Sequence, residues 1–158
     1  MDSESDYFRA SVGALIVGRD GRVLAFKRRA GNVGEWQLPQ GGLLRGEAPA
    51  TAVLREIREE TSIAAANLEV LEELGEWLGY ELPAEYRTPK TERGQVQKWF
   101  LLRFVGTDAD IHPDGSEFSA WQWMTSSDLL AAAVSFRQPV YRRVLDHWSA
   151  RLVAPGTR

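Results

Sequence analysis

Two neighbouring stretches organise this sequence: Gly41-Gly42-Leu43-Leu44-Arg45-Gly46-Glu47 and, after seven further residues, Arg55-Glu56-Ile57-Arg58-Glu59-Glu60-Thr61-Ser62-Ile63. Consecutive glycines let backbone N–H groups approach an oxyanion without a Cβ in the way, so Gly41 and Gly42 are candidate substrate-binding residues. Pro49 fits the first turn of a helix, where its missing N–H costs little. The two stretches predict a glycine loop that leads into a helix rich in carboxylates.

The predicted helix has an acidic stripe beside an apolar one. At about 100° per residue, Glu56, Glu59 and Glu60 fall within an arc of roughly 100°. Glutamates three and four residues apart repel one another, and a hard divalent cation offsets that repulsion. We therefore expect Mg²⁺ here, with Mn²⁺ as a substitute, and Glu60 as the best single ligand. The alternative is a solvated acidic face balanced by Arg55 and Arg58; the glycine loop at fixed spacing favours the metal.

The spacing Gly, five residues, Glu, seven residues, Arg-Glu-apolar-any-Glu-Glu-any-Gly-apolar resembles the signature of the Nudix hydrolases. The chain matches this signature from Gly41 to Ile63 with one departure, because Ser62 stands where the family has glycine. That glycine serves a left-handed helix end, a conformation that serine adopts at a cost of about 1 kcal/mol. A slightly altered helix exit with intact chemistry is expected.

Composition limits the fold and its partners. The chain has 158 residues, is 44% hydrophobic, contains Cys 0 and carries a net charge of −3. This length predicts one domain over residues 7–151, a disordered tail at 1–6 and a C-terminal tail at 152–158. The charge gives no global basic field for DNA, and no apolar run approaches the roughly 20 residues of a membrane span. The acidic N-terminus is unlike a secretory signal, so we expect a cytoplasmic protein.

Helical and strand patterns alternate along the chain. Besides the acidic helix, helices are expected at residues 126–134 and 140–151, and strands at 8–17, 23–29, 36–42, 67–82, 95–105 and 117–124. Such mixing predicts an α/β fold, with a mixed β-sheet between helices. The Nudix resemblance implies the same α/β/α sandwich.

Several charged residues are candidates for the site. Lys27 and Arg29 share one side of a strand and could meet phosphates, and Arg9 precedes the first buried run; a solvated strand end is an equal alternative for each. Glu117 opens an aromatic strand after a flexible acidic loop, where it could be a metal ligand or general base. Its alternative is a surface charge. Glu47 is expected to pair with Arg55 and hold the loop against the helix.

The resemblance extends beyond the signature to five spaced motifs: Trp36-Gln37-Leu38-Pro39-Gln40-Gly41-Gly42, Trp77-Leu78-Gly79-Tyr80-Glu81-Leu82-Pro83, Gly94-Gln95-Val96-Gln97-Lys98-Trp99-Phe100, Glu117-Phe118 with Trp121-Gln122-Trp123, and Ser135-Phe136-Arg137 with Val140-Tyr141-Arg142-Arg143. They are similar to the branch that contains dinucleoside polyphosphate hydrolases and bacterial RNA 5′-pyrophosphohydrolases. The resemblance implies that Glu56, Glu59, Glu60 and Glu117 hold metal and that Phe136 stacks on a base. It also implies that the nucleotide or phosphate site is lined by Tyr80, Gln95, Lys98 and Arg137.

The predicted activity is hydrolysis of a phosphoanhydride bond by an activated water, with Glu56 or Glu117 as the base. Gly79, Glu81 and Val96 stand inside motifs where RNA-acting relatives tend to carry basic residues. They favour diadenosine tetraphosphate, cleaved to ATP and AMP, over its alternative, release of pyrophosphate from the 5′ end of RNA. A sensor that binds a nucleotide without cleaving it is a third hypothesis, and the complete set of glutamates argues against it.

Overall fold

The computed structural model describes residues 6–29 and 35–153 of the chain. Its seven-stranded sheet comprises β1 (Phe8–Val17), β2 (Val23–Arg28), β3 (Trp36–Gln37), β4 (Gln40–Gly42), β5 (Leu68–Glu81), β6 (Gly94–Phe104) and β7 (Phe118–Met124). The α-helices of these residues are α1 (Pro49–Thr61), α2 (Ser126–Ala132) and α3 (Gln138–His147). Short 3-10 helices lie at η1 (Ala65–Asn67), η2 (Ala84–Tyr86), η3 (Asp108–Asp110) and η4 (Ser149–Arg151).

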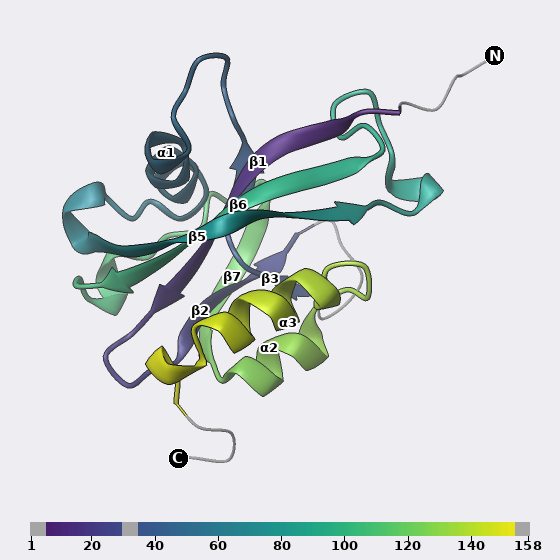
Figure 1. Cartoon of the computed structure of the whole chain (residues 1–158). Helices are drawn as coiled ribbons and strands as arrows, with labels where there is room; N and C mark the ends of the chain where they lie inside the picture. The colour runs from purple at the N-terminus through teal and green to yellow at the C-terminus, as the bar shows by residue number, and fades with distance from the viewer. Residues whose placement is uncertain (1–5, 30–34, 154–158) are drawn as a thin grey trace.

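The sheet is mixed and lies between helices. Its main strand order is β3-β2-β1-β6-β5, while β4 pairs with β1 and β7 pairs with β2. The β1–β6 pair is parallel and the other pairs are antiparallel. Figure 1 shows α1 on one face of the sheet and α2 and α3 on the other. The predicted α/β/α sandwich is therefore confirmed.

Strand β1 supplies both halves of the core because its side chains alternate between the two faces. Val12, Ala14 and Ile16 join the apolar cluster beneath α1. Leu15 and Val17 join the cluster beneath α2 and α3. Both clusters contain fully buried side chains, so the central strand is covered on each face.

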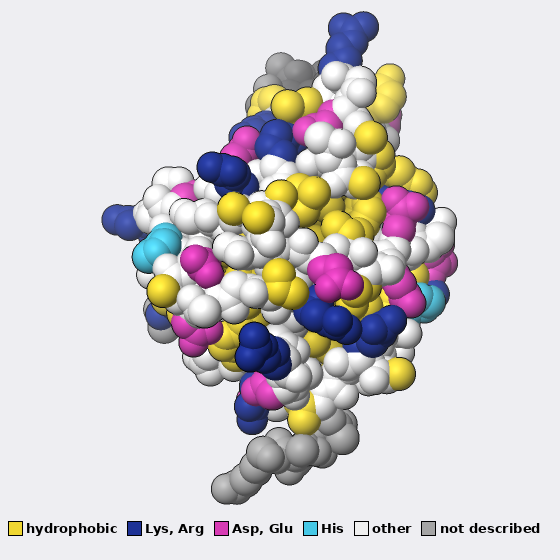
Figure 2. Space-filling model, turned by 90° about the vertical axis from the view of Figure 1, so that its left-hand side faces the viewer, with side chains coloured by type: hydrophobic (Ala, Val, Ile, Leu, Met, Phe, Trp, Pro, Cys, Tyr) yellow, Lys and Arg dark blue, Asp and Glu magenta, His cyan; other side chains and the backbone are white. Residues whose placement is uncertain are grey.

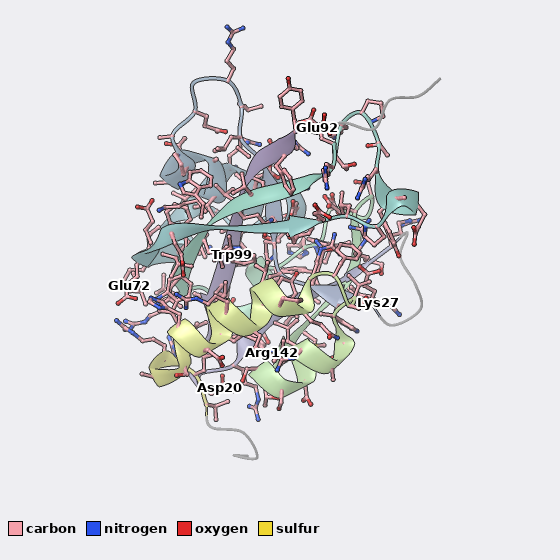
Figure 3. The ribbon with its side chains drawn as sticks, turned by 45° about the vertical axis from the view of Figure 1, so that its right-hand side comes forward. Asp20, Lys27, Glu72, Glu92, Trp99 and Arg142 are labelled. Atoms are coloured by element: carbon pink, nitrogen blue, oxygen red, sulfur yellow. The ribbon has the colours of Figure 1, made fainter. Side chains whose placement is uncertain are left out.

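Trp99 fills the space between the sheet and α3, as Figure 3 shows. A Cβ built on Gly13 would lie 2.6 Å from its ring, so the indole packs directly on the glycine backbone. On its other side Trp99 meets the ring of Tyr141 edge-on, with 5.9 Å between ring centroids. Glycine in β1 thus makes room for the largest core side chain.

The single strand expected at residues 36–42 is divided in two. β3 pairs with β2 and β4 pairs with β1, because Leu38 and Pro39 carry the chain from one neighbour to the other. The buried Leu38 N–H donates to the Tyr141 hydroxyl at 2.9 Å, and the Pro39 carbonyl accepts from Ala14 N–H at 3.0 Å. The crossing is therefore held by α3 and β1.

The C-terminal part differs from the expected single helix at residues 140–151. α3 begins two residues earlier and ends at His147, and a separate turn, η4, follows. Leu152 packs against the core, and Val153 N–H donates to the Gly21 carbonyl at 3.0 Å. Ordered structure thus continues past the predicted domain end, while residues 1–5 and 154–158 of the predicted tails lie outside the described residues.

Two surface features complete the fold. Among the described residues, Figure 2 shows acidic and basic side chains intermixed over the face that it presents. No helix in the described ranges is long and apolar enough to cross a membrane.

Replacing Tyr141 by phenylalanine tests the link between α3 and the β3–β4 crossing. Tyr141→Phe leaves the buried Leu38 N–H without its acceptor, so we expect the free energy of unfolding to fall by about 1–3 kcal/mol. Urea denaturation followed by tryptophan fluorescence measures this change. Tyr86→Phe is the matched control, because Tyr86 is 40% exposed. An equal effect of the two substitutions would contradict the assigned contact.

Candidate active site

The guanidinium of Arg55 joins the glycine loop to α1. Its Nε and Nη2 donate to both carboxylate oxygens of Glu47 at 2.8 Å, and Nη2 also donates to the Gly42 carbonyl at 2.9 Å. Its Nη1 donates to Glu56 at 2.8 Å and to Glu59 at 3.2 Å. The expected pair between Glu47 and Arg55 is therefore present, as part of a larger network.

Glu47 in turn closes the loop. Its Oε1 accepts the Leu44 N–H at 3.0 Å. The hydrogen bonds from Arg55, together with the one from Leu44, lower the pKa of Glu47 to about 2. The carboxylate thus stays charged and keeps the loop against α1 over the neutral and mildly acidic range.

Gly41 and Gly42 are required by the closeness of two side chains. A Cβ on Gly41 would lie 2.0 Å from the Glu56 carboxylate, and one on Gly42 would lie 1.9 Å from the Arg9 guanidinium. Neither glycine has a positive φ. The absence of a Cβ at these two glycines therefore lets the side chains of Glu56 and Arg9 pack directly against the backbone.

Glu60 is the most buried of the glutamates on α1. It is 3% exposed, and its Oε2 has no hydrogen-bond partner in the described part of the chain. Burial raises its pKa well above the usual value, and the nearby carboxylates of Glu117 and Glu56 add to the shift. A positive charge at this position would offset both the desolvation and the repulsion.

These donors fit a hard divalent cation by their chemistry, since carboxylate oxygens are the preferred ligands of Mg²⁺. Within the described residues no three acidic or histidine side chains already form an arrangement that could hold a metal ion. Arg55 holds Glu56, and the Glu59 side chain is 58% exposed. Binding of a metal ion would therefore require the side chains of Glu56 and Glu59 to turn towards the buried Oε2 of Glu60.

The helix exit has the left-handed geometry that the signature demands. Ser62 adopts φ 68°, and its N–H donates to the Arg58 carbonyl. Its hydroxyl donates to the His112 carbonyl at 2.8 Å, a contact that glycine could not make. The departure from the signature therefore adds a tether between α1 and the loop before β7.

That loop carries Glu117 to the end of α1. Asp114 N–H donates to the Glu60 carbonyl at 2.9 Å. The Asp114 carboxylate accepts the N–H groups of Glu117 at 3.1 Å and Phe118 at 3.0 Å. Glu117 is an exposed residue. Partial burial of its carboxylate nevertheless raises its pKa, while the charge of Arg28 acts in the opposite direction.

A cavity of about 450 Å³ brings most of the predicted residues together. Of those residues its wall includes Arg9, Gly41, Gly42, Glu56, Glu59, Glu60, Tyr80, Gln95, Glu117, Phe136 and Arg137. It also includes residues that the sequence did not single out, namely Arg28, Glu35, Gln40, Leu82, Tyr86, Lys90, Thr91 and Asp114. Acidic and basic side chains thus surround one cavity.

Lys27 and Arg29 do not line this cavity, and Arg28 between them does. The pairing of β2 with β7 shifts its register between Lys27 and Arg28, at the end of β2, and phosphate contacts by Lys27 and Arg29 stay a prediction. Figure 3 shows Lys27 on the side where α2 and α3 pack, and Arg29 donates to the Gly115 carbonyl at 2.6 Å. The alternation of strand residues was visible in the sequence, but its phase relative to the cavity was not.

Lys98 is also absent from the cavity wall. Its Nζ donates to the Gly75 carbonyl at 3.0 Å, where the register of β5 against β6 shifts, and lies 5.8 Å from the centroid of the Trp77 ring. Gln95 lines the cavity from the same strand, three residues earlier, and therefore faces the other way. Lys98 thus contacts an irregular part of β5 outside this cavity, and its predicted role in binding the nucleotide or phosphate stays a prediction.

A buried ion pair holds one of the cavity arginines. The Glu35 carboxylate accepts from Arg137 Nη1 at 2.9 Å and lies 3.8 Å from Arg28 Nε. Glu35 and Arg137 are 6% and 7% exposed. The Arg137 Nε faces no hydrogen-bond partner in the described ranges. Because the two residues of the pair are 102 positions apart, no local sequence signal could have revealed it.

Three aromatic rings form one side of the cavity. Phe136 stacks with Tyr80 at a centroid distance of 5.9 Å and meets Tyr86 at 5.0 Å. The Arg137 guanidinium lies 4.9 Å from the Phe136 centroid. Carboxylates, cations and aromatic rings facing one hollow are suited to a ligand that has both phosphates and a base.

Acid titration tests the role of Glu47 in holding the loop. Its lowered pKa means that it stabilises the folded state above about pH 4.5 and loses this effect as the pH falls towards 2. We expect Glu47→Gln to be less stable than the wild type at pH 7 and to match it near pH 2. Urea denaturation at pH 7, 4 and 2.5 measures the difference, and a constant difference at all three values would contradict the assignment.

Known proteins resemble this chain in sequence over nearly its whole length. The family described as NUDIX domain matches residues 7–144. An RNA pyrophosphohydrolase of Roseobacter denitrificans is 43% identical over 151 residues, which cover 92% of this chain and 94% of that protein. An RNA pyrophosphohydrolase of Zymomonas mobilis is 38% identical over 150 residues, covering 92% and 97%.

Solved structures share the fold at lower sequence identity. The dihydroneopterin triphosphate pyrophosphohydrolase of E. coli has a TM-score of 0.72 at 21% identity and covers 90% of this chain and 99% of its own. A C. elegans Ap4A hydrolase has a TM-score of 0.68 at 20% identity, covering 90% and 98%. Fold, cavity and sequence agree, and the chain belongs to the Nudix hydrolases as a pyrophosphohydrolase.

Proposed function

We propose that this protein removes pyrophosphate from the 5′ end of triphosphorylated RNA and leaves a 5′ monophosphate. The observation that carries the proposal is its 38–43% identity, over most of the chain, to proteins named RNA pyrophosphohydrolase. The earlier preference for diadenosine tetraphosphate has less support, since the Ap4A hydrolase resembles this chain at only 20% identity.

The residues behind that earlier preference lie outside the cavity. Gly79, Glu81 and Val96 are not among its lining residues, whereas Tyr80 and Gln95 are. Tyr80 pairs with Gln95 across the strands, and Gly79 pairs with Val96. Because the pleat turns successive side chains to opposite faces, missing positive charge at these three positions does not change the charge of the cavity wall.

The cavity wall carries charges of both signs, with six acidic side chains beside its cationic ones, in a chain whose net charge is −3. Four of its lining side chains are cationic: Arg9, Arg28, Lys90 and Arg137. A 5′ triphosphate needs only a few such contacts, and guanidinium groups bind phosphate oxygens in pairs. These four cations support binding of a polyphosphate end without a broad basic surface.

Divalent-metal chemistry is expected of the family, and we assign Mg²⁺ to Glu56, Glu59, Glu60 and Glu117, with Mn²⁺ as a substitute. When bound, the ion would neutralise phosphate charge and make a water more acidic. Phe136 and Arg137 would hold the terminal nucleotide, with Tyr80 and Gln95 beneath it. We also propose that the protein acts in the cytoplasm.

Water attacks the polyphosphate, the bond between the α and β phosphates breaks, and pyrophosphate leaves. A carboxylate must take the proton of the attacking water, and the two candidates are Glu56 and Glu117. Arg55 already donates to Glu56 at 2.8 Å. This contact favours Glu117 as the proton acceptor.

A direct assay compares 5′-triphosphorylated RNA with diadenosine tetraphosphate in the presence of Mg²⁺. We expect faster release of pyrophosphate from RNA than of ATP from the dinucleotide. Glu60→Gln should lower kcat on RNA by about 100-fold or more, the scale of losing one group that stabilises transition-state charge. Rates are measured by chromatography of the products.

Glu73→Gln is the matched control, because Glu73 lies on β5 away from the cavity wall. Urea denaturation of both variants checks that they fold. Preferential cleavage of the dinucleotide would overturn the proposal in favour of the alternative. Binding without turnover of either substrate would indicate a nucleotide sensor.

A further inference from the structure

Residues 83–93, which connect β5 to β6, form part of the cavity rim. Tyr86, Lys90 and Thr91 of this loop line the cavity. Figure 1 shows the loop beyond the ends of β5 and β6, next to the start of β1, and Figure 3 places Glu92 at this end of the molecule. Lys90 was counted above only as one of the four cavity cations, and no contact to the nucleotide has been assigned to this loop.

Hydrogen bonds fix the shape of the loop. The N–H of Thr88 donates to Thr91 Oγ1 at 2.7 Å, and the N–H of Thr91 donates to Thr88 Oγ1 at 3.1 Å. Arg87 Nε donates to the Leu82 carbonyl at 2.8 Å, and Arg93 N–H donates to the Tyr7 carbonyl at 3.1 Å. A loop that is already shaped loses less conformational entropy when it binds a ligand.

Tyr86 presents the exposed aromatic surface at the cavity mouth. It is 40% exposed, whereas Tyr80 is 8% exposed. Phe136 is half-buried and already has Tyr80, Tyr86 and the Arg137 guanidinium as ring neighbours. A base that follows the one bound at Phe136 would therefore meet Tyr86 next.

Lys90 is exposed on the same rim. No hydrogen bond or ion pair engages its ammonium group among the contacts found in the described residues. Arg93, by contrast, pairs with Glu81 at 3.0 Å. Lys90 is thus an exposed point charge available to a phosphate on the same rim as Tyr86.

We propose that Tyr86 and Lys90 form a subsite for the body of a single-stranded RNA, downstream of its 5′ end. Tyr86 stacks on a base, and Lys90 contacts a backbone phosphate; this combination of ring and cation is how proteins hold single strands without reading sequence. The inference rests on the proposed function. It also explains how the active site would prefer RNA to a nucleoside triphosphate, which has nothing to place on this rim.

The ratio of kcat/KM for a triphosphorylated RNA of eight nucleotides to that for ATP tests the subsite. Tyr86→Ala should lower this ratio about tenfold, mainly through a higher KM for RNA, because stacking of one base is lost. Tyr86→Phe keeps the ring and should restore the ratio. An equal loss on both substrates would show that Tyr86 only supports the packing of Phe136, and no loss would equally overturn the subsite.

Salt dependence tests Lys90 separately. Lys90→Ala should weaken RNA binding and reduce the slope of log affinity against log salt concentration by about 0.7, the value for one phosphate contact on a single strand. Lys90→Arg keeps the charge and should keep the slope. A slope unchanged in Lys90→Ala would overturn the phosphate contact.

A binding measurement separates failure of the subsite from failure of the proposed function. The wild type should bind 5′-monophosphorylated RNA of eight nucleotides more tightly than AMP, and Tyr86→Ala should reduce this preference, whether or not RNA is cleaved. If the wild type releases no pyrophosphate from RNA, the proposed function fails. If it cleaves RNA but both variants bind RNA as the wild type does, the subsite alone fails.

Discussion

The guanidinium of Arg55 is the group on which the geometry of the site depends. It bonds the Gly42 carbonyl, Glu47, Glu56 and Glu59, so it ties a strand end, a loop and the acidic helix to one another. A planar group with five donors can satisfy such a set, whereas a lysine ammonium has only three. The network also keeps the acidic face of α1 partly neutralised, which offsets the repulsion between its glutamates.

The fold brings four separate parts of the chain to that helix. β1 and β4 supply Arg9 and the two glycines, and the loop before β7 supplies Asp114 and Glu117. The start of α3 supplies Arg137 from the opposite face of the sheet. Tyr141 of the same helix holds Leu38, so the packing of α3 positions both the aromatic wall and the glycine loop. The same packing contacts of α3 therefore stabilise the core and position the residues of the active site.

Charge in this protein is arranged locally. The chain has a net charge of −3, and the wall of its cavity contains four cationic side chains together with carboxylates. The ion pair between Glu35 and Arg137 is buried, which costs desolvation energy unless the pair is well matched. In the proposed reaction the pair would favour phosphate binding, because the arginine is already oriented before the substrate arrives. Net charge alone therefore says little about which polyphosphate is bound.

The sequence by itself determined most of the strand and helix pattern, the sandwich and the cluster of glutamates on α1, because period-two and helical spacing are local properties of the chain. It also singled out Tyr80, Phe136 and Arg137 through the motifs they share with a known family, and Arg9 through its place before the first buried run, and all four line the cavity. Only the tertiary structure decided that Arg28 lines the cavity while Lys27, Arg29 and Lys98 do not. The same holds for Glu35, Tyr86, Lys90 and Asp114, because which face of a strand meets a cavity, and which distant loops close it, depend on contacts between segments far apart in the chain.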